Sequence, residues 1–228
     1  SKPSKKQVLH VDFETRSEAD LKKVGAYVYA THPSTQIICM GWAFDDGEPQ
    51  IWAPEFSSDF PVEVIEHLTA NEPRASHAHN AQFERLIVKY VLPSYAEFPQ
   101  PDIDHWCCTA AQARARALPG ALDDLGACLN LPIQKDKRGK ELIKLLCIPN
   151  VDENGGIGFN LDPHLLSEMY EYCKQDVRTE RLAAQVTPPL TDAEHADWVV
   201  SEMVNDAGLK VDVAFAEAAT EYAAAEVA

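Results

Sequence analysis

The sequence predicts an α/β fold, a β-sheet flanked by helices, with a helical C-terminal extension. The amino-terminal quarter contains short runs rich in β-branched and apolar residues that end at turn signals, which is the pattern of strands. After Pro61 the apolar residues recur at every third or fourth position, which indicates helices. From Asp162 onward this helical spacing dominates the chain.

The first strands are expected near the amino terminus. Residues 8–13 form one of them, and because side chains alternate along a strand, Asp12 and Glu14 should lie on the same face. Residues 37–44 and 48–52 are separated by an Asp-Asp-Gly turn, so we predict that they form a hairpin.

Helical spacing marks much of the remaining chain. A long helix should begin at Asp162 and Pro163, since aspartate is a favoured N-cap and proline suits the first helical position. Three glycines between residues 150 and 160 predict a loop before it. One further strand is expected at 74–79. The other helices are predicted at residues 62–68, from about residue 81, at 107–118, at 122–129 and at 140–146, with a charged loop at 134–139.

The Pro188-Pro189 pair marks the expected domain boundary. We predict a first domain at residues 1–187 and a helical region at 188–228. A Thr-x-x-Glu capping box follows the prolines, which indicates the start of a helix. The helical segment at 216–228 ends without a cap or a terminating glycine, so we expect the sequence to be cut from a longer chain.

The composition excludes a wholly disordered chain and a polybasic, histone-like binder. Of the 228 residues, 46% are hydrophobic and 25% are charged, which is typical of a globular protein. The 20 basic and 36 acidic residues give a net charge of −16, so a polyanionic ligand would need local basic groups or bound cations. No apolar run approaches the roughly 20 residues of a membrane span. We therefore expect no interaction with a membrane.

The six cysteines show no CxxC spacing, and no signal peptide precedes them. We expect reduced, mostly buried thiols in a cytoplasmic protein. The adjacent Cys107 and Cys108 are accordingly interpreted as core residues and not as a redox site.

Four acidic positions, Asp12, Glu14, Glu84 and Asp176, carry the candidate chemistry. Tyr172 lies four residues before Asp176 on a predicted helix, so the two should share a face. Carboxylates that converge repel one another unless cations lie between them. Hard divalent ions such as Mg²⁺ prefer oxygen ligands, and two of them about 4 Å apart can hold the attacking and leaving oxygens of a phosphodiester.

Three short motifs, in this order along the chain, resemble those of the DEDD superfamily of 3′–5′ exonucleases. Asp12-Phe13-Glu14-Thr15 is similar to the first motif, D-x-E-T. Residues 80–84, Asn-Ala-Gln-Phe-Glu, are similar to the second, N-x-x-[FY]-D, and Tyr172-x-x-x-Asp176 to the third, Y-x-x-x-D. The tyrosine is typical of the DEDDy branch, because the other branch has a histidine at the position of Glu171.

The resemblance is closest to the proofreading exonuclease domain of family A, phage-like DNA polymerases, and it covers residues 8 to about 187. It implies a ribonuclease H-like exonuclease fold with a mixed β-sheet flanked by helices. The implied activity is hydrolysis of phosphodiester bonds at the 3′ end of single-stranded DNA, which releases nucleoside monophosphates during DNA replication. Residues 198–212 look like the entry into a polymerase domain, which would then lie in cis.

The resemblance also implies a metal site with two Mg²⁺ ions, for which Mn²⁺ should substitute. Asp12, Glu14 and Asp176 would hold the first ion, and Asp12 would be shared with the second. Tyr172 would orient the attacking water through its hydroxyl. Glu84 stands where the family has aspartate, so it would hold the second ion through water or only weakly.

The remaining implied contacts are with the nucleic acid. Thr15, together with Glu14, would contact the terminal nucleotide, and Phe83 would stack on an unpaired base. Asn80 would support the strand end. Two alternatives stay open: a 3′–5′ exoribonuclease of the same superfamily, because the metal chemistry acts on the phosphate, and a nucleic-acid-binding module whose nuclease has decayed, which only Glu84 supports.

Other polar groups have simpler interpretations. His77 and His79 suggest a metal pair, but a structural role or a substrate contact is favoured. The best basic patch for a phosphate backbone is equally well interpreted as a solvated loop; it consists of Lys135, Lys137, Arg138 and Lys140.

Overall fold

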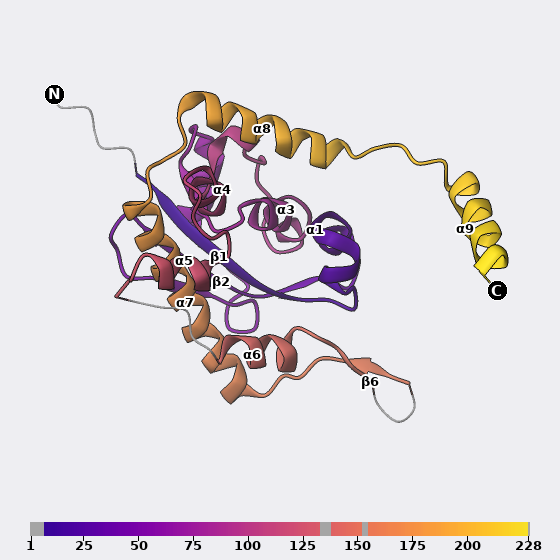
Figure 1. Ribbon diagram of the computed structural model, residues 1–228. Coiled ribbons are helices and arrows are strands. Elements are labelled where there is room, and N and C mark those ends of the chain that lie inside the picture. Colours follow the sequence, from indigo (N-terminus) through magenta and orange to yellow (C-terminus); the bar gives the residue numbers. More distant parts are fainter. Residues whose placement is uncertain (1–6, 133–137, 152–154, 228) are drawn as a thin grey trace.

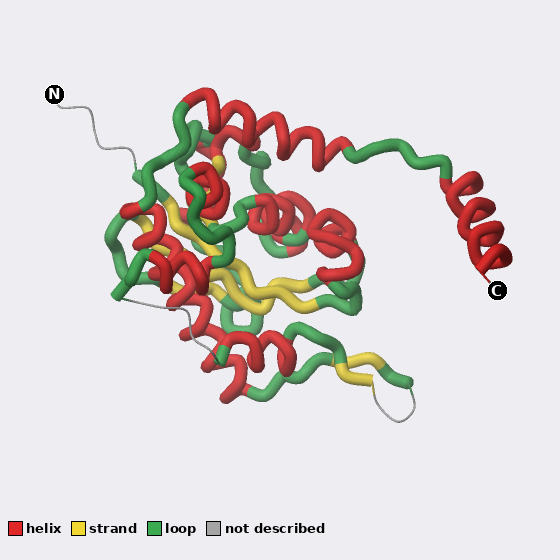
Figure 2. Tube along the Cα trace, in the orientation of Figure 1, coloured by secondary structure: helices red, strands yellow, loops and turns green. Residues whose placement is uncertain are grey.

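Five strands form a mixed sheet between two layers of helices. The computed structural model describes residues 7–132, 138–151 and 155–227, and the strand order is β3-β2-β1-β4-β5. Figure 1 shows α6 and α7 on one side of this sheet and α1 and α3 on the other, and Figure 2 shows the strands between them. The predicted α/β architecture, a mixed sheet flanked by helices, is confirmed.

β1 (Leu9–Arg16) lies at the centre of the sheet. It pairs antiparallel with β2 (Gln36–Phe44), which in turn pairs antiparallel with β3 (Gln50–Trp52), as the predicted hairpin requires. On its other side β1 pairs parallel with β4 (Ser76–Ala78), and β4 pairs parallel with β5 (Trp106–Cys108). The first strand is longer than predicted and contains the whole of the first motif.

The predicted helix starts are largely confirmed. Asp162 caps the long helix by accepting a hydrogen bond from the amide of His164, and Thr191 and Glu194 form the expected capping box. The described helices are α1 (Leu21–Thr31), α2 (Val62–Ala70), α3 (Gln82–Tyr90), α4 (Thr109–Ala115), α5 (Leu122–Cys128), α6 (Gly139–Leu146), α7 (Pro163–Val186), α8 (Asp192–Ala207) and α9 (Val213–Val227), with 3-10 turns at Leu92–Ser94 and Ile103–His105.

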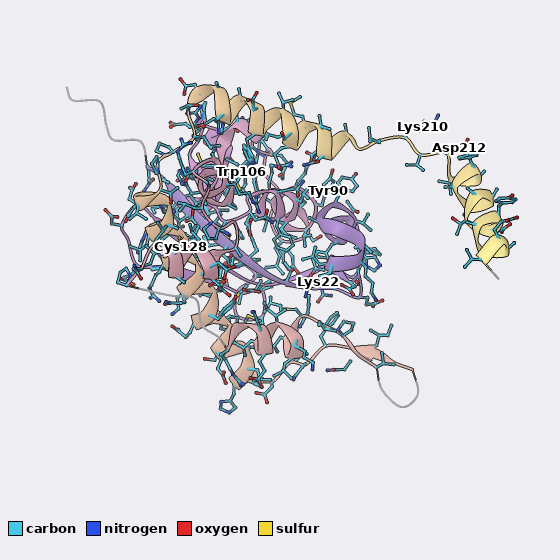
Figure 3. The ribbon with its side chains drawn as sticks, viewed as in Figure 1. Lys22, Tyr90, Trp106, Cys128, Lys210 and Asp212 are labelled. Atoms are coloured by element: carbon cyan, nitrogen blue, oxygen red, sulfur yellow. The ribbon has the colours of Figure 1, made fainter. Side chains whose placement is uncertain are left out.

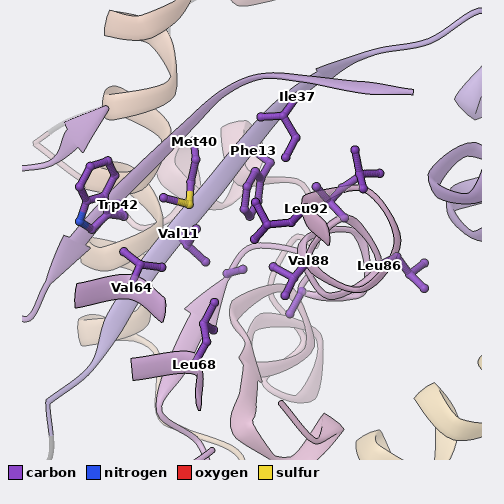
Figure 4. Packing of buried hydrophobic residues seen from close by; sticks show 14 of the residues in the cluster. Val11, Phe13, Ile37, Met40, Trp42, Val64, Leu68, Leu86, Val88 and Leu92 are labelled. Atoms are coloured by element: carbon purple, nitrogen blue, oxygen red, sulfur yellow. The ribbon is translucent and has the colours of Figure 1, made fainter. Parts of the chain in front are cut away.

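β1 separates the two sides of the interior. Its side chains Leu9, Val11 and Phe13 point into the hydrophobic cluster that α2 and α3 cover. Figure 4 shows Val11 and Phe13 in this cluster. The alternate positions His10 and Asp12 contact α7 on the opposite face. Strand alternation therefore decides that the first motif directs its acidic side chains toward α7 and not toward the main core.

Gly41 allows α7 to pack closely against the sheet. It lies on β2 opposite Asp12. A Cβ atom at this position would be 2.9 Å from Cys173 Sγ and 3.3 Å from the Cys173 carbonyl oxygen, both on α7. The absence of a side chain therefore fixes how near the helix lies to the first motif.

Three local elements differ from the prediction. Cys107 and Cys108 belong to β5 and not to a helix, because pairing with β4 buries both of them, and α4 begins at Thr109. The expected loop before α7 contains a two-stranded hairpin, β6 (Asn150–Val151) with β7 (Ile157–Gly158). α1 was not predicted, since it is interrupted at Gly25, whose φ is 77°.

Two sequence expectations concern chemistry and not local structure. All six cysteines are free thiols, as predicted. In the described part of the chain, no helix is both long enough and apolar enough to cross a membrane. Most of the predicted charged loop at 134–139 lies outside the described residues.

α8 is attached to the sheet domain by a buried ion-pair network. Arg85 on α3 donates to Glu202 at 2.7 Å and to Asp206 at 2.7 and 2.8 Å. Burial lowers the pKa of Arg85, but the hydrogen bonds to Asp206 and Glu202 outweigh this effect and raise it. The guanidinium is therefore charged and paired inside the protein.

α9 differs from α8 because none of its described residues is buried. Figure 3 labels Lys210 and Asp212 in the segment that joins the two helices, and there α9 stands away from the sheet domain. The boundary between residues 187 and 188 stays a prediction.

We predict that Arg85→Ala destabilises the protein by about 3–5 kcal/mol, because it leaves the buried carboxylate of Glu202 without its cation. Urea unfolding followed by circular dichroism measures the change. Lys23→Ala is the control, since its ion pair with Asp20 is exposed, and it should cost less than about 1 kcal/mol. Equal effects of the two substitutions would contradict the prediction.

Candidate metal centre

Asp12, Glu14 and Asp176 form one compact group. Each contributes a carboxylate oxygen, and these three atoms lie within 4.8 Å of one another. Asp176 is 3% exposed and Glu14 is 9% exposed, while Asp12 is half-buried. The structure therefore brings together three of the four acidic residues that the sequence singled out, although Asp176 lies more than 160 positions after Asp12 and Glu14 in the chain.

Two features of the fold produce this group. Asp12 and Glu14 project from the same face of β1 because they are two residues apart on a strand. α7 passes over that face at the close approach permitted by Gly41, and Asp176 lies in the middle of the helix. The sequence spacing predicted the strand face, but the partnership with Asp176 depends on the packing of α7.

Glu84 lies beside this group and not within it. It is in the first turn of α3 and only 4% exposed, and its Oε2 accepts no hydrogen bond from the described residues. Burial raises the pKa of Glu84 well above its ordinary value, and the charges of Asp12, Glu180 and Glu14 raise it further. A buried carboxyl in this state favours a proton, unless a cation supplies the missing countercharge.

Tyr172 is buried one helical turn before Asp176. Burial raises the pKa of its hydroxyl, and the charges of Asp176, Glu14 and Asp12 raise it further, as does a hydrogen bond with Asp176. The hydroxyl therefore keeps its proton at neutral pH and acts as a donor. Gly139 packs against the ring, where a Cβ atom would overlap the aromatic carbons.

The three residues expected at the nucleic acid have different environments. Asn80 is exposed and has a positive φ of 66°, a conformation that asparagine tolerates better than most residues. Phe83 is half-buried, with its ring centroid 6.0 Å from that of Tyr29. Thr15 is buried and its hydroxyl is 2.8 Å from the Tyr29 hydroxyl. Contact of these residues with a substrate stays a prediction.

Sequence reasoning missed Cys173 as a neighbour of the metal centre. Its thiol donates to Asp12 Oδ2 at 3.4 Å, a weak hydrogen bond from α7 to β1. Burial raises the pKa of Cys173 well above its ordinary value, so it is a neutral donor. The i, i+3 spacing of Cys173 and Asp176 was a usable signal, because it places them on neighbouring positions of a helix.

His79 and Arg138 both have contacts within the protein. His79 Nε2 is 2.9 Å from the carbonyl oxygen of Gly120, which is a structural contact. Arg138 forms ion pairs with Glu141 and Glu168. Lys135 and Lys137 lie outside the described residues, so the basic patch as a whole stays a prediction.

The donor set suits a hard divalent cation. The three grouped side chains offer only carboxylate oxygens, the ligands that Mg²⁺ and Mn²⁺ prefer, and no soft ligand belongs to the group. The orphaned Oε2 of Glu84 adds a further oxygen at the edge of the same site. A cation here would also relieve the repulsion among the clustered charges.

Comparison with known proteins supports a polymerase relation. The chain is 35% identical over 220 residues to a DNA polymerase of Bacillus phage SP02, a match that covers 91% of this chain and 32% of that protein. The chain thus spans about a third of the length of the curated relative. No protein-family model matches the chain. The predicted similarity to a phage DNA polymerase is confirmed. The assignment of this chain as an exonuclease domain is a proposal.

We predict that Asp176→Asn removes stabilisation by divalent ions. In chelator the variant should unfold at the same or a higher temperature than the natural protein, because one of three mutually repelling charges is gone. Mn²⁺ at a hundred times its dissociation constant should stabilise the natural protein by about 2.7 kcal/mol and the variant far less. Thermal unfolding with and without Mn²⁺ measures both effects.

Asp197→Asn on the exposed surface of α8 is the matched control, and it should respond to Mn²⁺ as the natural protein does. Full Mn²⁺ stabilisation of Asp176→Asn would show that Asp176 is not a ligand.

Proposed function

We propose that the chain is a metal-dependent 3′–5′ exonuclease that hydrolyses the terminal phosphodiester bond of single-stranded DNA, as the proofreading module of a DNA polymerase. The observation that carries the proposal is the buried group of Asp12, Glu14 and Asp176 with Tyr172 beside it. The similarity to a phage DNA polymerase supports DNA as the substrate.

We further propose that the fold is ribonuclease H-like. The supporting observation is the sheet, in which β1, β2 and β3 form an antiparallel meander while β4 and β5 run parallel to β1 on its other edge. This order brings the central strand, with its acidic residues, under α7. The active site would thus be built on rigid elements, which favours accurate positioning of charged groups.

In the proposed site, Asp12, Glu14 and Asp176 would hold the first divalent ion. Asp12 would be shared with a second ion, which Glu84 would hold through water or weakly. Two such ions, Mg²⁺ or Mn²⁺, supply charge stabilisation of the attacking and leaving oxygens of the phosphodiester. The protein holds its carboxylates in a buried, preorganised arrangement, so little reorganisation is needed when the phosphate arrives.

Tyr172 orients the attacking water. Its raised pKa keeps the hydroxyl protonated, so the tyrosine donates a hydrogen bond and does not remove a proton. Packing of Gly139 against the ring holds the hydroxyl in place. Asn80 lies in the turn that leads into α3 and supports the strand end, and Phe83 in the first turn of α3 stacks on an unpaired base. Thr15 contacts the terminal nucleotide.

The proposed products are nucleoside 5′-monophosphates, and the proposed partners are single-stranded DNA ends and a polymerase domain in cis. Residues 1–187 would form the exonuclease domain and residues 188–228 the helical start of the polymerase region. α8 would then be the connecting element, fixed to the exonuclease by Arg85.

The test is incubation of DNA and RNA strands of one sequence, labelled at the 5′ end, with Mg²⁺, Mn²⁺ or chelator, and separation of the products by length. We expect a ladder shortened from the 3′ end on DNA that requires metal, with slower cleavage of RNA. Faster cleavage of RNA would identify an exoribonuclease, and binding without any cleavage would identify a decayed module.

Two substitutions in the same assay compare the contribution of a metal ligand, Asp12, with that of Tyr172. Asp12→Ala should lower the rate on the order of 10³-fold or more, because it removes a ligand shared by both ions. Tyr172→Phe should lower it by about 10²-fold, at the low end for a group that positions a reactant. Asp197→Asn should leave the rate unchanged. Equal losses for the first two would make the tyrosine a ligand or a base.

A separate prediction concerns Glu84. Glu84→Asp should keep activity with an altered Mg²⁺ requirement, because the shorter acid reaches the same ion through a small shift or a water molecule. Glu84→Ala should lose most activity, and Mn²⁺ should restore more of it than Mg²⁺ does. Rates over a series of metal concentrations measure this. Unchanged metal dependence in Glu84→Ala would exclude Glu84 from the site.

A further inference from the structure

A second buried polar network lies directly beside the metal centre. His10 Nδ1 on β1 is 2.7 Å from Glu180 Oε2 on α7, and the hydroxyl of Thr109 donates to Glu180 Oε1. His77 on β4 pairs with His10 in the sheet, and their ring centroids are 5.3 Å apart. His10, Thr109 and Glu180 are all buried, with Glu180 only 2% exposed.

This network is in register with the metal centre. His10 precedes Asp12 by two residues on β1, a step of about 6.7 Å along a strand. Glu180 follows Asp176 by four residues on α7, a step of about 6 Å along a helix. The two steps nearly match. The neighbouring pairs Asp12–Asp176 and His10–Glu180 therefore follow one another along the same strand and the same helix.

The bonding of Glu180 is strong enough to hold that register. Burial raises the pKa of Glu180, but the charge of His10, its hydrogen bond, the charge of His77 and the hydrogen bond from Thr109 outweigh it and lower the pKa to about 2. Both carboxylate oxygens are therefore used by groups on β1 and α4. A carboxylate held at both oxygens cannot slide along the sheet without breaking a buried hydrogen bond.

We propose that His10, Thr109 and Glu180 are positioning residues of the metal centre: their buried hydrogen bonds set the register of α7 on β1 and thereby hold Asp176 opposite Asp12. The role in catalysis rests on the proposed nuclease function, but the positioning itself is measurable as metal affinity. Outer partners that orient metal ligands typically change metal affinity by about 10–100-fold when they are removed.

The experiment measures the Mn²⁺ dissociation constant of the full chain by electron paramagnetic resonance of free Mn²⁺. Glu180→Ala should raise this constant by about 10-fold or more. Glu180→Gln keeps the shape and can bond to both Thr109 and His10, so it should stay close to the natural protein. Thr179→Ala is the control, because Thr179 is also buried on α7 but bonds to the Gln175 carbonyl oxygen of its own helix.

The outcomes separate positioning from general destabilisation. Thr179→Ala should keep the natural Mn²⁺ affinity, and Glu180→Ala should lose affinity at a temperature where circular dichroism shows both variants folded. If Glu180→Ala does not fold, Thr109→Val should still weaken Mn²⁺ binding. This substitution keeps the shape and removes the hydroxyl that donates to Glu180 and to the Ala78 carbonyl oxygen. The proposal is overturned if a folded Glu180→Ala variant binds Mn²⁺ as tightly as the natural protein does. The same holds for Thr109→Val where that variant replaces Glu180→Ala. Equal losses of Mn²⁺ affinity in Glu180→Gln and Glu180→Ala would also overturn it.

Two further results distinguish this proposal from its alternatives. If the natural protein binds Mn²⁺ but cleaves no nucleic acid, the proposed function fails while the positioning proposal is still decided by the affinities. If elemental analysis finds stoichiometric zinc that His77→Ala loses, the cluster of His10, His77 and Glu180 is itself a metal site, and the positioning proposal is overturned.

Discussion

The close approach of α7 to the centre of the sheet is the constraint on which the rest of the structure depends. Any side chain at Gly41 would meet Cys173 of α7, so the helix can lie at this distance only over a glycine. Tyr172 and Asp176 belong to the same helix and take their places over β1 as a consequence. A larger residue at position 41 would therefore displace Tyr172 and Asp176 without touching either side chain.

This packing brings acidic side chains together where water screens them poorly. Glu14, Asp176 and Glu84 are buried, and neighbouring carboxylates together with burial raise the pKa of Glu84. Such an arrangement opposes folding in the absence of cations, in a chain that already carries a net charge of −16. Such crowding of buried carboxyl groups is expected at a functional site and not in a structural core.

Two other buried networks of polar side chains lie in the described part of the chain. Arg85 binds Glu202 and Asp206 between α3 and α8, and Glu180 binds His10 between α7 and β1. These two networks flank the acidic group and fix the helices that contribute to it. Because Arg85 directly follows Glu84 on α3, the attachment of α8 also constrains the helix that presents Glu84.

The sequence by itself determined the local features of this protein. Strand alternation placed Asp12 and Glu14 on one face, helical spacing paired Tyr172 with Asp176, and capping residues marked the starts of α7 and α8, because these patterns depend on neighbours within a few positions. Pairing between distant segments was decided only by the tertiary structure. It moved Cys107 and Cys108 into a strand, joined β1 to α7, and placed Glu84 beside the compact group and not inside it, since burial and close packing depend on residues that are far apart in the chain.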